Sequence, residues 1–210
     1  MIPAKADPAA QADFLETKLR PRLQQAQRGH RTVLFVDAAH FVYGPFLGFL
    51  WCLARLFVRA PSGRKRYNVL AALDAVTHQV IRVTNDSYIN AESVCQLIRQ
   101  LAAAGLPRPL TLVLDNARYQ RCELVQSLAR SLKVELLFLP SYSPNLNLIE
   151  RLWKFVKKES LAAKQLPTYE AFTAAIDECL NDLHTRHKTK MATLLTLNFQ
   201  TFENEPILVA

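Results

Sequence analysis

Residues 138–159, FLPSYSPNLNLIERLWKFVKKE, combine an apolar strand end, a proline-rich turn and the start of an amphipathic helix. Pro140 and Pro144 bound a short polar segment that interrupts regular structure. Beyond this segment apolar residues recur at helical spacing, which predicts a helix over residues 147–164 with one buried stripe. The stretch therefore predicts that Glu150 stands near the start of a helix that packs on the protein core.

Two aspartates follow apolar runs that are typical of buried strands. Asp37 ends the run at residues 33–36, and Asp115 ends the run at residues 112–114. Because strand ends in α/β sheets open onto the crevice where ligands bind, pairing of the two strands would bring both carboxylates together. A divalent cation relieves the repulsion between such carboxylates, and oxygen-only ligands suit Mg²⁺ or Mn²⁺. Asp37, Asp115 and Glu150 are the predicted catalytic residues and ligands of two such ions on a phosphodiester.

Each of the three acidic residues also has a purely structural interpretation. Aspartate is common in turns that follow strands. Asn147 is a candidate helix cap, which would place Glu150 in a capping box or pair it with Lys154 on the surface. The helix pattern favours more than this, because Glu150, Trp153, Lys154 and Lys157 lie together away from the apolar stripe. We interpret that side as a surface that meets a phosphate backbone, with a solvated polar face as the alternative.

The rest of the chain predicts a mixed α/β sheet with helices on its faces. Strands are expected at residues 32–37, 47–58, 67–74, 80–84, 110–115 and 134–139. Helices are expected from residue 7 toward residue 29 and at residues 90–104, 119–132, 147–164 and 168–184. We divide the chain into an N-terminal helical linker (1–30), a catalytic domain (31–190) and a C-terminal tail (191–210).

Composition favours a nucleic-acid partner and an internal compartment. The chain has 26 Lys and Arg against 18 Asp and Glu, a formal net charge of +8 over 210 residues. Such an excess attracts polyanions, although it also serves solubility. The four cysteines form no C-x-x-C pair, and the first residues lack the apolar core of a signal peptide. The apolar stretch at residues 41–58 is broken by glycine, proline and arginine, so we expect a cytoplasmic protein without a membrane span.

Three segments carry a resemblance to a known family: VLFVDAAHF at residues 33–41, LTLVLDNARYQ at residues 110–120, and the stretch at residues 138–159. They resemble the DDE-type catalytic domain of bacterial insertion-sequence transposases of the mariner-like superfamily, specifically the insertion sequence 630 family. The third family motif reads approximately L-P-x-Y-S-P-x-L-N-x-I-E-x-x-W, and every specified position matches between Leu139 and Trp153. The 34 residues between Asp115 and Glu150 also match the family spacing.

The resemblance implies a ribonuclease-H-like fold, with a five-stranded mixed sheet flanked by helices, over residues 31–190. It also implies an Mg²⁺-dependent (or Mn²⁺-dependent) DNA transposase in which Asp37, Asp115 and Glu150 hold two ions. In the family, water attacks a phosphodiester at the element end, and the freed 3′-hydroxyl attacks target DNA, usually at a TA dinucleotide. Because such enzymes act on two DNA ends, a homodimer is expected.

One departure from the family pattern leaves a second hypothesis open. Family members carry helix-turn-helix modules before the catalytic domain, and only about thirty residues precede the first expected strand here. A separately encoded helix-turn-helix half is one expected partner. The alternative is a catalytically incompetent, truncated product that binds DNA or regulates full-length transposase. A repair nuclease of the same fold, which would hydrolyse DNA without joining it, is a third hypothesis.

The sequence also offers candidates for DNA contact. A basic cluster occupies a predicted turn, polar residues follow the second aspartate, and others lie near Glu150. Each has a simpler alternative: a solvated turn for the cluster, a loop hydrogen bond for Asn116 and helix capping for Asn147. The candidates are Arg64, Lys65, Arg66, Asn116, Arg118, Asn147, Trp153, Lys154 and Lys157.

Overall fold

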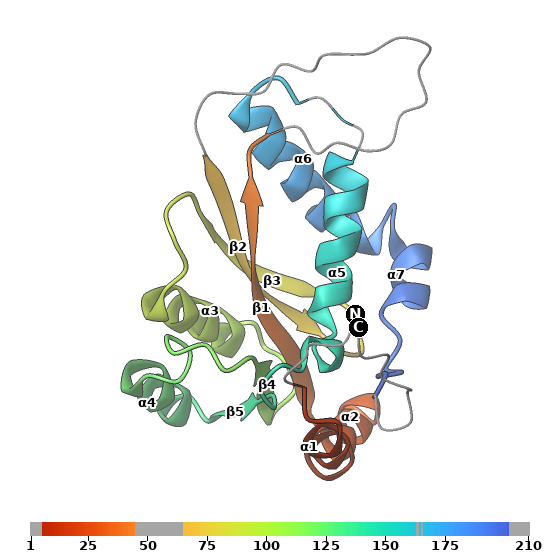
Figure 1. Cartoon of the computed structure of the whole chain (residues 1–210). Coiled ribbons are helices and arrows are strands. Elements are labelled where there is room, and N and C mark those ends of the chain that lie inside the picture. Colours follow the sequence, from red (N-terminus) through yellow and green to blue (C-terminus); the bar gives the residue numbers. More distant parts are fainter. Residues whose placement is uncertain (1–5, 45–64, 163, 165, 202–210) are drawn as a thin grey trace.

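The computed structural model describes residues 6–44, 65–162, 164 and 166–201. Its centre is a mixed five-stranded sheet with the strand order β3-β2-β1-β4-β5 (Figure 1). The strands are β1 (Thr32–Val42), β2 (Arg66–Asp74), β3 (Val80–Asn85), β4 (Leu110–Leu114) and β5 (Val134–Phe138). β1 pairs antiparallel with β2 and parallel with β4, β2 pairs antiparallel with β3, and β4 pairs parallel with β5. The predicted five-stranded mixed sheet is therefore confirmed.

Strand β1 is longer than the sequence predicted. We expected it to end at Asp37, but it continues for five more residues to Val42. The antiparallel partner β2 explains the difference, because its pairing with β1 continues as far as Val42 opposite Arg66. Asp37 is therefore inside a strand and not at its end. The expected strand at residues 47–58 lies outside the described residues.

Helices cover both faces of the sheet, as the apolar residues on each face require. One face packs against α3 (Ala91–Ala103) and α4 (Glu123–Ser131). The other face packs against the N-terminal helices and the helices that follow β5 (Figure 1). The helices on this second face are α1 (Pro8–Phe14), η1 (Leu15–Leu19), α2 (Arg20–Gln27), η2 (Pro144–Leu146), α5 (Ile149–Val156), η3 (Lys157–Leu161), α6 (Tyr169–Asn181), η4 (Asp182–His184) and α7 (Lys188–Leu194).

Two expected helices differ from the observed ones. The helix predicted at residues 119–132 begins only at Glu123, because residues 117–121 form successive turns and Cys122 has an extended backbone. The helix predicted at residues 147–164 is α5 followed by the wider turn η3, so its regular part ends at Val156.

No helix in the described part of the chain is long and apolar enough to cross a membrane.

The N-terminal segment is helical, as predicted, but it is not a linker. The helical stretch from Pro8 to Gln27 buries Phe14, Leu15, Leu19 and Leu23 in the same core as the sheet. The expected C-terminal tail is also wrong in part, since residues of α7 and those just after it join this core. The described residues of both segments therefore pack on the folded unit.

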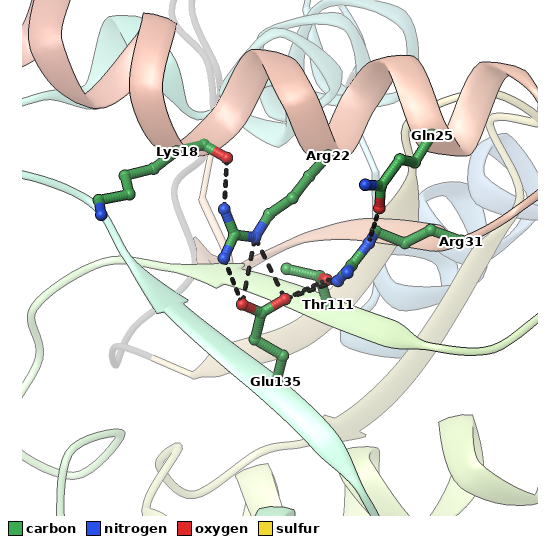
Figure 2. A network of polar contacts seen from close by, with 6 residues as sticks. All are labelled: Lys18, Arg22, Gln25, Arg31, Thr111 and Glu135. Carbon is green, nitrogen blue, oxygen red and sulfur yellow. Dashed lines mark hydrogen bonds and ion pairs between the residues drawn. The ribbon is translucent and has the colours of Figure 1, made fainter.

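An ion-pair network fastens the N-terminal helix to the edge of the sheet (Figure 2). Glu135 on β5 accepts hydrogen bonds from Arg22 on α2 at 2.5 Å and from Arg31 at 2.6 Å. Thr111 on β4 donates to the same carboxylate at 2.8 Å. Hydrogen bonding and charge pairing with Arg22 lower the pKa of Glu135 to about 2, against the opposing effect of burial. The network therefore depends on an ionised Glu135.

We expect Glu135→Gln to lower the free energy of unfolding by about 1–2 kcal/mol near neutral pH, because two arginines lose their charged partner. The folded pKa of Glu135 lies below the usual value of 4.5, so its contribution is complete above that value and disappears as the pH falls toward about 2. Urea unfolding near pH 7 and near pH 3 measures this difference. An unchanged gap between wild type and variant at both pH values would contradict the prediction.

Candidate active site

The three predicted acidic residues line a single pocket of about 270 Å³. Asp37 comes from β1, Asp115 follows β4, and Glu150 comes from α5. The loop between β5 and α5 forms the remaining wall, together with two residues that follow Asp115. The full lining is Asp37, Asp115, Asn116, Ala117, Leu139, Pro140, Ser141, Tyr142, Ser143, Pro144, Asn147 and Glu150.

The register of the sheet explains why the two aspartates meet. Phe35 on β1 is paired with Val113 on β4, and these are the last paired residues of the two parallel strands. Asp37 and Asp115 each lie two residues further along, so they occupy equivalent positions on the same face of the sheet. Phe35 and Val113 are both part of the core under α5, which places the aspartates on the side of Glu150.

The electrostatics of Asp37 are strongly perturbed. Burial, followed by the nearby charges of Glu150 and Asp115, raises the pKa of Asp37 to about 7. A hydrogen bond from Trp153 Nε1 to Asp37 Oδ2, 3.0 Å long, acts in the opposite direction. A bound cation would favour the ionised form of this carboxyl group, because a nearby positive charge lowers the pKa of a carboxyl group. Such a perturbed pKa is typical of functional sites.

Trp153 does not lie where the sequence analysis placed it. We expected it on an outward face with Lys154 and Lys157, but its side chain is only 3% exposed and packs edge-on against Phe41. The buried stripe of α5 is wider than predicted, because the helix lies against β1 and turns its Trp153 side toward Asp37. The tryptophan is therefore not available to stack on DNA, and its predicted role as a DNA contact is wrong.

Asn147 also departs from the capping interpretation. The residue that precedes α5 is Leu148, and no side chain caps this helix. The Asn147 side chain is 4% exposed and lines the pocket, and its Oδ1 has no hydrogen-bond partner among the described residues. The capping box that would have explained Glu150 is therefore absent from α5, and a buried acceptor oxygen is left beside the carboxylates.

Asn116 makes a hydrogen bond within the loop region, which was the simpler alternative to a DNA contact. Its side-chain Nδ2 donates a hydrogen bond to the carbonyl of Leu139, which joins the end of β4 to the end of β5. Asp115 Oδ1 accepts from the backbone N–H of Ala117 at 3.1 Å. Both contacts fix the backbone on one side of the pocket, and both residues still line it.

The predicted basic contacts fall into two groups. Arg118 is exposed close to the pocket, and on α5 and the turn after it Lys154 is exposed and Lys157 is partly exposed. Lys65 and Arg66 are exposed at the start of β2, where Lys65 lies 5.2 Å from the ring centre of Tyr169. Neither of these two lines the acidic pocket. Arg64 lies outside the described residues.

The donor set fits a hard divalent cation that is shared with a substrate. In the described ranges, no three Asp, Glu, His or Cys side chains gather closely enough to enclose a metal by themselves. The three carboxylates instead occupy separate walls of one pocket, with the unpartnered Asn147 Oδ1 beside them. Mg²⁺ is commonly held in this manner, by a few carboxylates together with water and substrate phosphate oxygens. The pocket thus offers oxygen ligands and lacks sulfur and imidazole ligands.

Two tyrosines at the site were missed by the sequence analysis. Burial, followed by the charges of Asp115 and Asp37, raises the pKa of Tyr119 to about 12, although this residue does not line the pocket. Tyr142 lines the pocket and exposes 53% of its surface. Only the motif around residues 138–159 could have drawn attention to Tyr142, and nothing in the local pattern indicated Tyr119.

Comparison with known proteins agrees with this geometry. The model of the family "DDE superfamily endonuclease" matches residues 54–173, which is more than half of the chain and includes Asp115 and Glu150. An insertion element IS630 uncharacterized 39 kDa protein of Shigella sonnei is 29% identical over 125 residues. That alignment covers 58% of this chain and 36% of the relative, so the chain spans about a third of this relative's length.

Solved structures show the same fold at low sequence identity. The Mos1 transposase paired-end complex with left transposon end has a TM-score of 0.65 at 17% identity, covering 95% of this chain and 66% of that one. The Mos1 mariner paired end complex with Mn gives a TM-score of 0.65 at 16% identity over the same shares. The catalytic domain of Mos1 mariner transposase gives a TM-score of 0.60 at 15% identity and is covered completely, against 95% of this chain. The expected ribonuclease-H-like fold is confirmed.

We expect Asp37→Asn to stabilise the metal-free protein by about 1–3 kcal/mol near pH 8, because the variant no longer places a charge beside Glu150. The folded pKa of Asp37 is raised, so the cost is absent below the usual value of 3.8 and complete above about pH 7. The gain in the variant should therefore shrink as the pH falls toward 4. Urea unfolding in the presence of a chelator measures it, and a variant less stable than wild type at pH 8 would contradict the prediction.

Proposed function

Since the chain belongs to the DDE superfamily endonuclease family and has the fold of a transposase catalytic domain, we propose that it cleaves and joins DNA at transposon ends. The observation that carries this proposal is the convergence of Asp37, Asp115 and Glu150 on one pocket from three different elements. The relatives that match include an insertion-element protein and a transposase bound to transposon-end DNA, which supports the same substrate class.

The carboxylates of Asp37, Asp115 and Glu150 would hold two Mg²⁺ or Mn²⁺ ions against the scissile phosphate. The bound ions supply positive charge that activates the attacking oxygen and stabilises the leaving one. Trp153 keeps the Asp37 carboxylate in its orientation through the 3.0 Å hydrogen bond. Asn147 Oδ1 is placed to accept a hydrogen bond from an ordered water in the pocket.

Two in-line displacements at phosphorus would follow each other at this site. In the first, a water oxygen forms the new P–O bond, the bond to the 3′-oxygen breaks, and a 3′-hydroxyl is released. In the second, that 3′-hydroxyl attacks a phosphodiester of target DNA, and the displaced oxygen leaves the target strand. Both steps need the same geometry, so one carboxylate pocket serves them in turn. The resemblance to the insertion sequence 630 family favours a target that contains a TA dinucleotide.

Basic residues around the pocket would hold the DNA backbone. Arg118 lies exposed beside the pocket, while Lys154 and Lys157 follow Glu150 along α5 and the turn after it. Lys65 and Arg66 at the start of β2 would contact DNA farther from the cut. Because an element has two ends, we propose that two copies of the chain act together, and that a helix-turn-helix unit recognises the element ends.

We expect Glu150→Gln to reduce Mg²⁺-dependent joining by about 100-fold or more, while the protein stays folded and its melting temperature does not fall. Transfer of a labelled duplex with a free 3′-hydroxyl into supercoiled plasmid measures the activity, with and without an added helix-turn-helix partner. Glu123→Gln is the matched control, because Glu123 is an exposed residue of α4 on the other face of the sheet.

Three results of this experiment would count against the proposal. Joining by Glu150→Gln at the wild-type rate would remove the carboxylate site from the mechanism. Hydrolysis without joined product would favour the repair-nuclease hypothesis. DNA binding by wild type without either reaction, under all partner conditions, would favour the regulatory product.

We expect the double variant Lys154→Ala, Lys157→Ala to weaken DNA binding and to reduce the salt dependence of the association constant. Each lost phosphate contact removes about 0.9 from the slope of log K against log salt, so two contacts should remove about 1.8. Fluorescence anisotropy at several salt concentrations measures this slope. The matched control is Lys18→Ala, Lys188→Ala, which removes two exposed lysines from η1 and α7. An equal change of slope in the control would contradict the assignment.

A further inference from the structure

Tyr142 combines three features at the mouth of the acidic pocket. Tyr142 is 53% exposed, it lines the pocket, and its backbone has a φ of 57°. A left-handed conformation is uncommon for a bulky side chain, and it persists only where the surroundings enforce it. Among the described non-glycine residues with positive φ, His78 lies in the turn after β2 and Lys133 lies just beyond α4. Tyr142 differs from both because it faces the candidate active site.

A residue of the N-terminal helical segment contacts the backbone of Tyr142. Gln11 on α1 has an exposed fraction of 0%, although its side chain is polar. Its Nε2 donates a hydrogen bond of 3.3 Å to the carbonyl of Tyr142, and its Oε1 accepts one of 2.9 Å from Asn145 Nδ2. One buried glutamine therefore bridges two points of the loop between β5 and α5.

The loop is firmly anchored on the helix side of Tyr142. Leu146 and Leu148 are completely buried, and Asn145 makes a second hydrogen bond of 2.8 Å to the carbonyl of Gln200. The ring of Tyr142 is thus presented to solvent from a backbone that is held in place. Keeping an exposed aromatic ring on a fixed, strained backbone suggests a ligand contact more than a packing role.

From these observations we propose that Tyr142 stacks on the nucleobase next to the scissile phosphate, and that Gln11 is the positioning residue that holds it there. The inference rests on the proposed function. A phosphate held by metal ions on the three carboxylates would leave its nearest base at the rim of the same pocket, where Tyr142 is exposed. Aromatic rings bind bases through their faces, so the contact requires the ring and not the hydroxyl group.

The experiment uses the full chain and an uncleaved transposon-end duplex, in which 2-aminopurine replaces the base next to the scissile phosphate. Ca²⁺ replaces Mg²⁺ so that the DNA is bound but not consumed. Stacking quenches the fluorescence of 2-aminopurine, and anisotropy of a distant label gives the dissociation constant. We expect quenching with wild type and with Tyr142→Phe. Tyr142→Ala should lose the quenching and bind about 5- to 100-fold more weakly.

The positioning role of Gln11 has its own test. Gln11→Met keeps the length of the side chain and removes both hydrogen bonds, and Gln24→Met on the exposed side of α2 is the control. At saturating protein, DNA bound to Gln11→Met should show weaker quenching than DNA bound to wild type, whereas the control should match wild type. If Gln11→Met does not fold, Asn145→Ala removes the other half of the bridge and should show the same partial loss.

The outcomes separate this inference from the proposed function. Absence of DNA binding and joining by wild type would overturn the proposed function. If wild type binds and joins DNA, full quenching by Tyr142→Ala would overturn the stacking contact, and so would loss of quenching in Tyr142→Phe. Full quenching at saturation by a folded Gln11→Met or Asn145→Ala variant would overturn the role of Gln11.

Discussion

The parallel pairing of β1 with β4 determines where every other part of the site must lie. The register that pairs Phe35 with Val113 places Asp37 and Asp115 at equivalent positions, on the face that α5 covers. Because side chains alternate along a strand, a shift of one residue would turn Asp37 toward α3 and α4, away from Glu150. The register is well determined, since completely buried residues on both faces of β1 would have to exchange places in such a shift. The packing of the core therefore determines the positions of Asp37 and Asp115, independently of any contact between the acidic residues.

Placing three carboxylates in one pocket costs electrostatic free energy, and the surrounding protein offsets this cost only in part. Asp37 is surrounded by core residues and by two other carboxylates, and its raised pKa reflects this. The indole of Trp153 supplies one compensating hydrogen bond, and the backbone around Asp37 is held by pairing with β2. Binding sites commonly retain such strain, because the ligand that relieves it is then bound more tightly. Trp153 is thus better understood as support for the carboxylate than as a surface for DNA.

The sequence predicted the elements well and their edges poorly. Apolar runs and turn residues indicated all five strands of the sheet and the three acidic residues, because burial leaves a strong local pattern. The extension of β1 beyond Asp37 depends on pairing with β2, a partner about thirty residues away, so no local signal marks it. Trp153 was placed on the wrong side because the helical pattern does not reveal how wide the covered face is. The capping role of Asn147 failed for a related reason: the helix begins one residue later, at a position whose side chain is apolar.

The two segments that were expected to be a linker and a tail both contact the loop between β5 and α5, from opposite ends of the chain. Gln11 on α1 bonds to Tyr142 and Asn145, while the carbonyl of Gln200 accepts from Asn145. Arg151, next to Glu150 on α5, donates to the carbonyls of Thr196 at 2.8 Å and Asn198 at 2.6 Å. These contacts lie beside Glu150 and not in a remote part of the fold. A domain boundary at residue 30 or 190 would therefore remove the contacts that hold the pocket entrance, even though it would leave all three carboxylates in place.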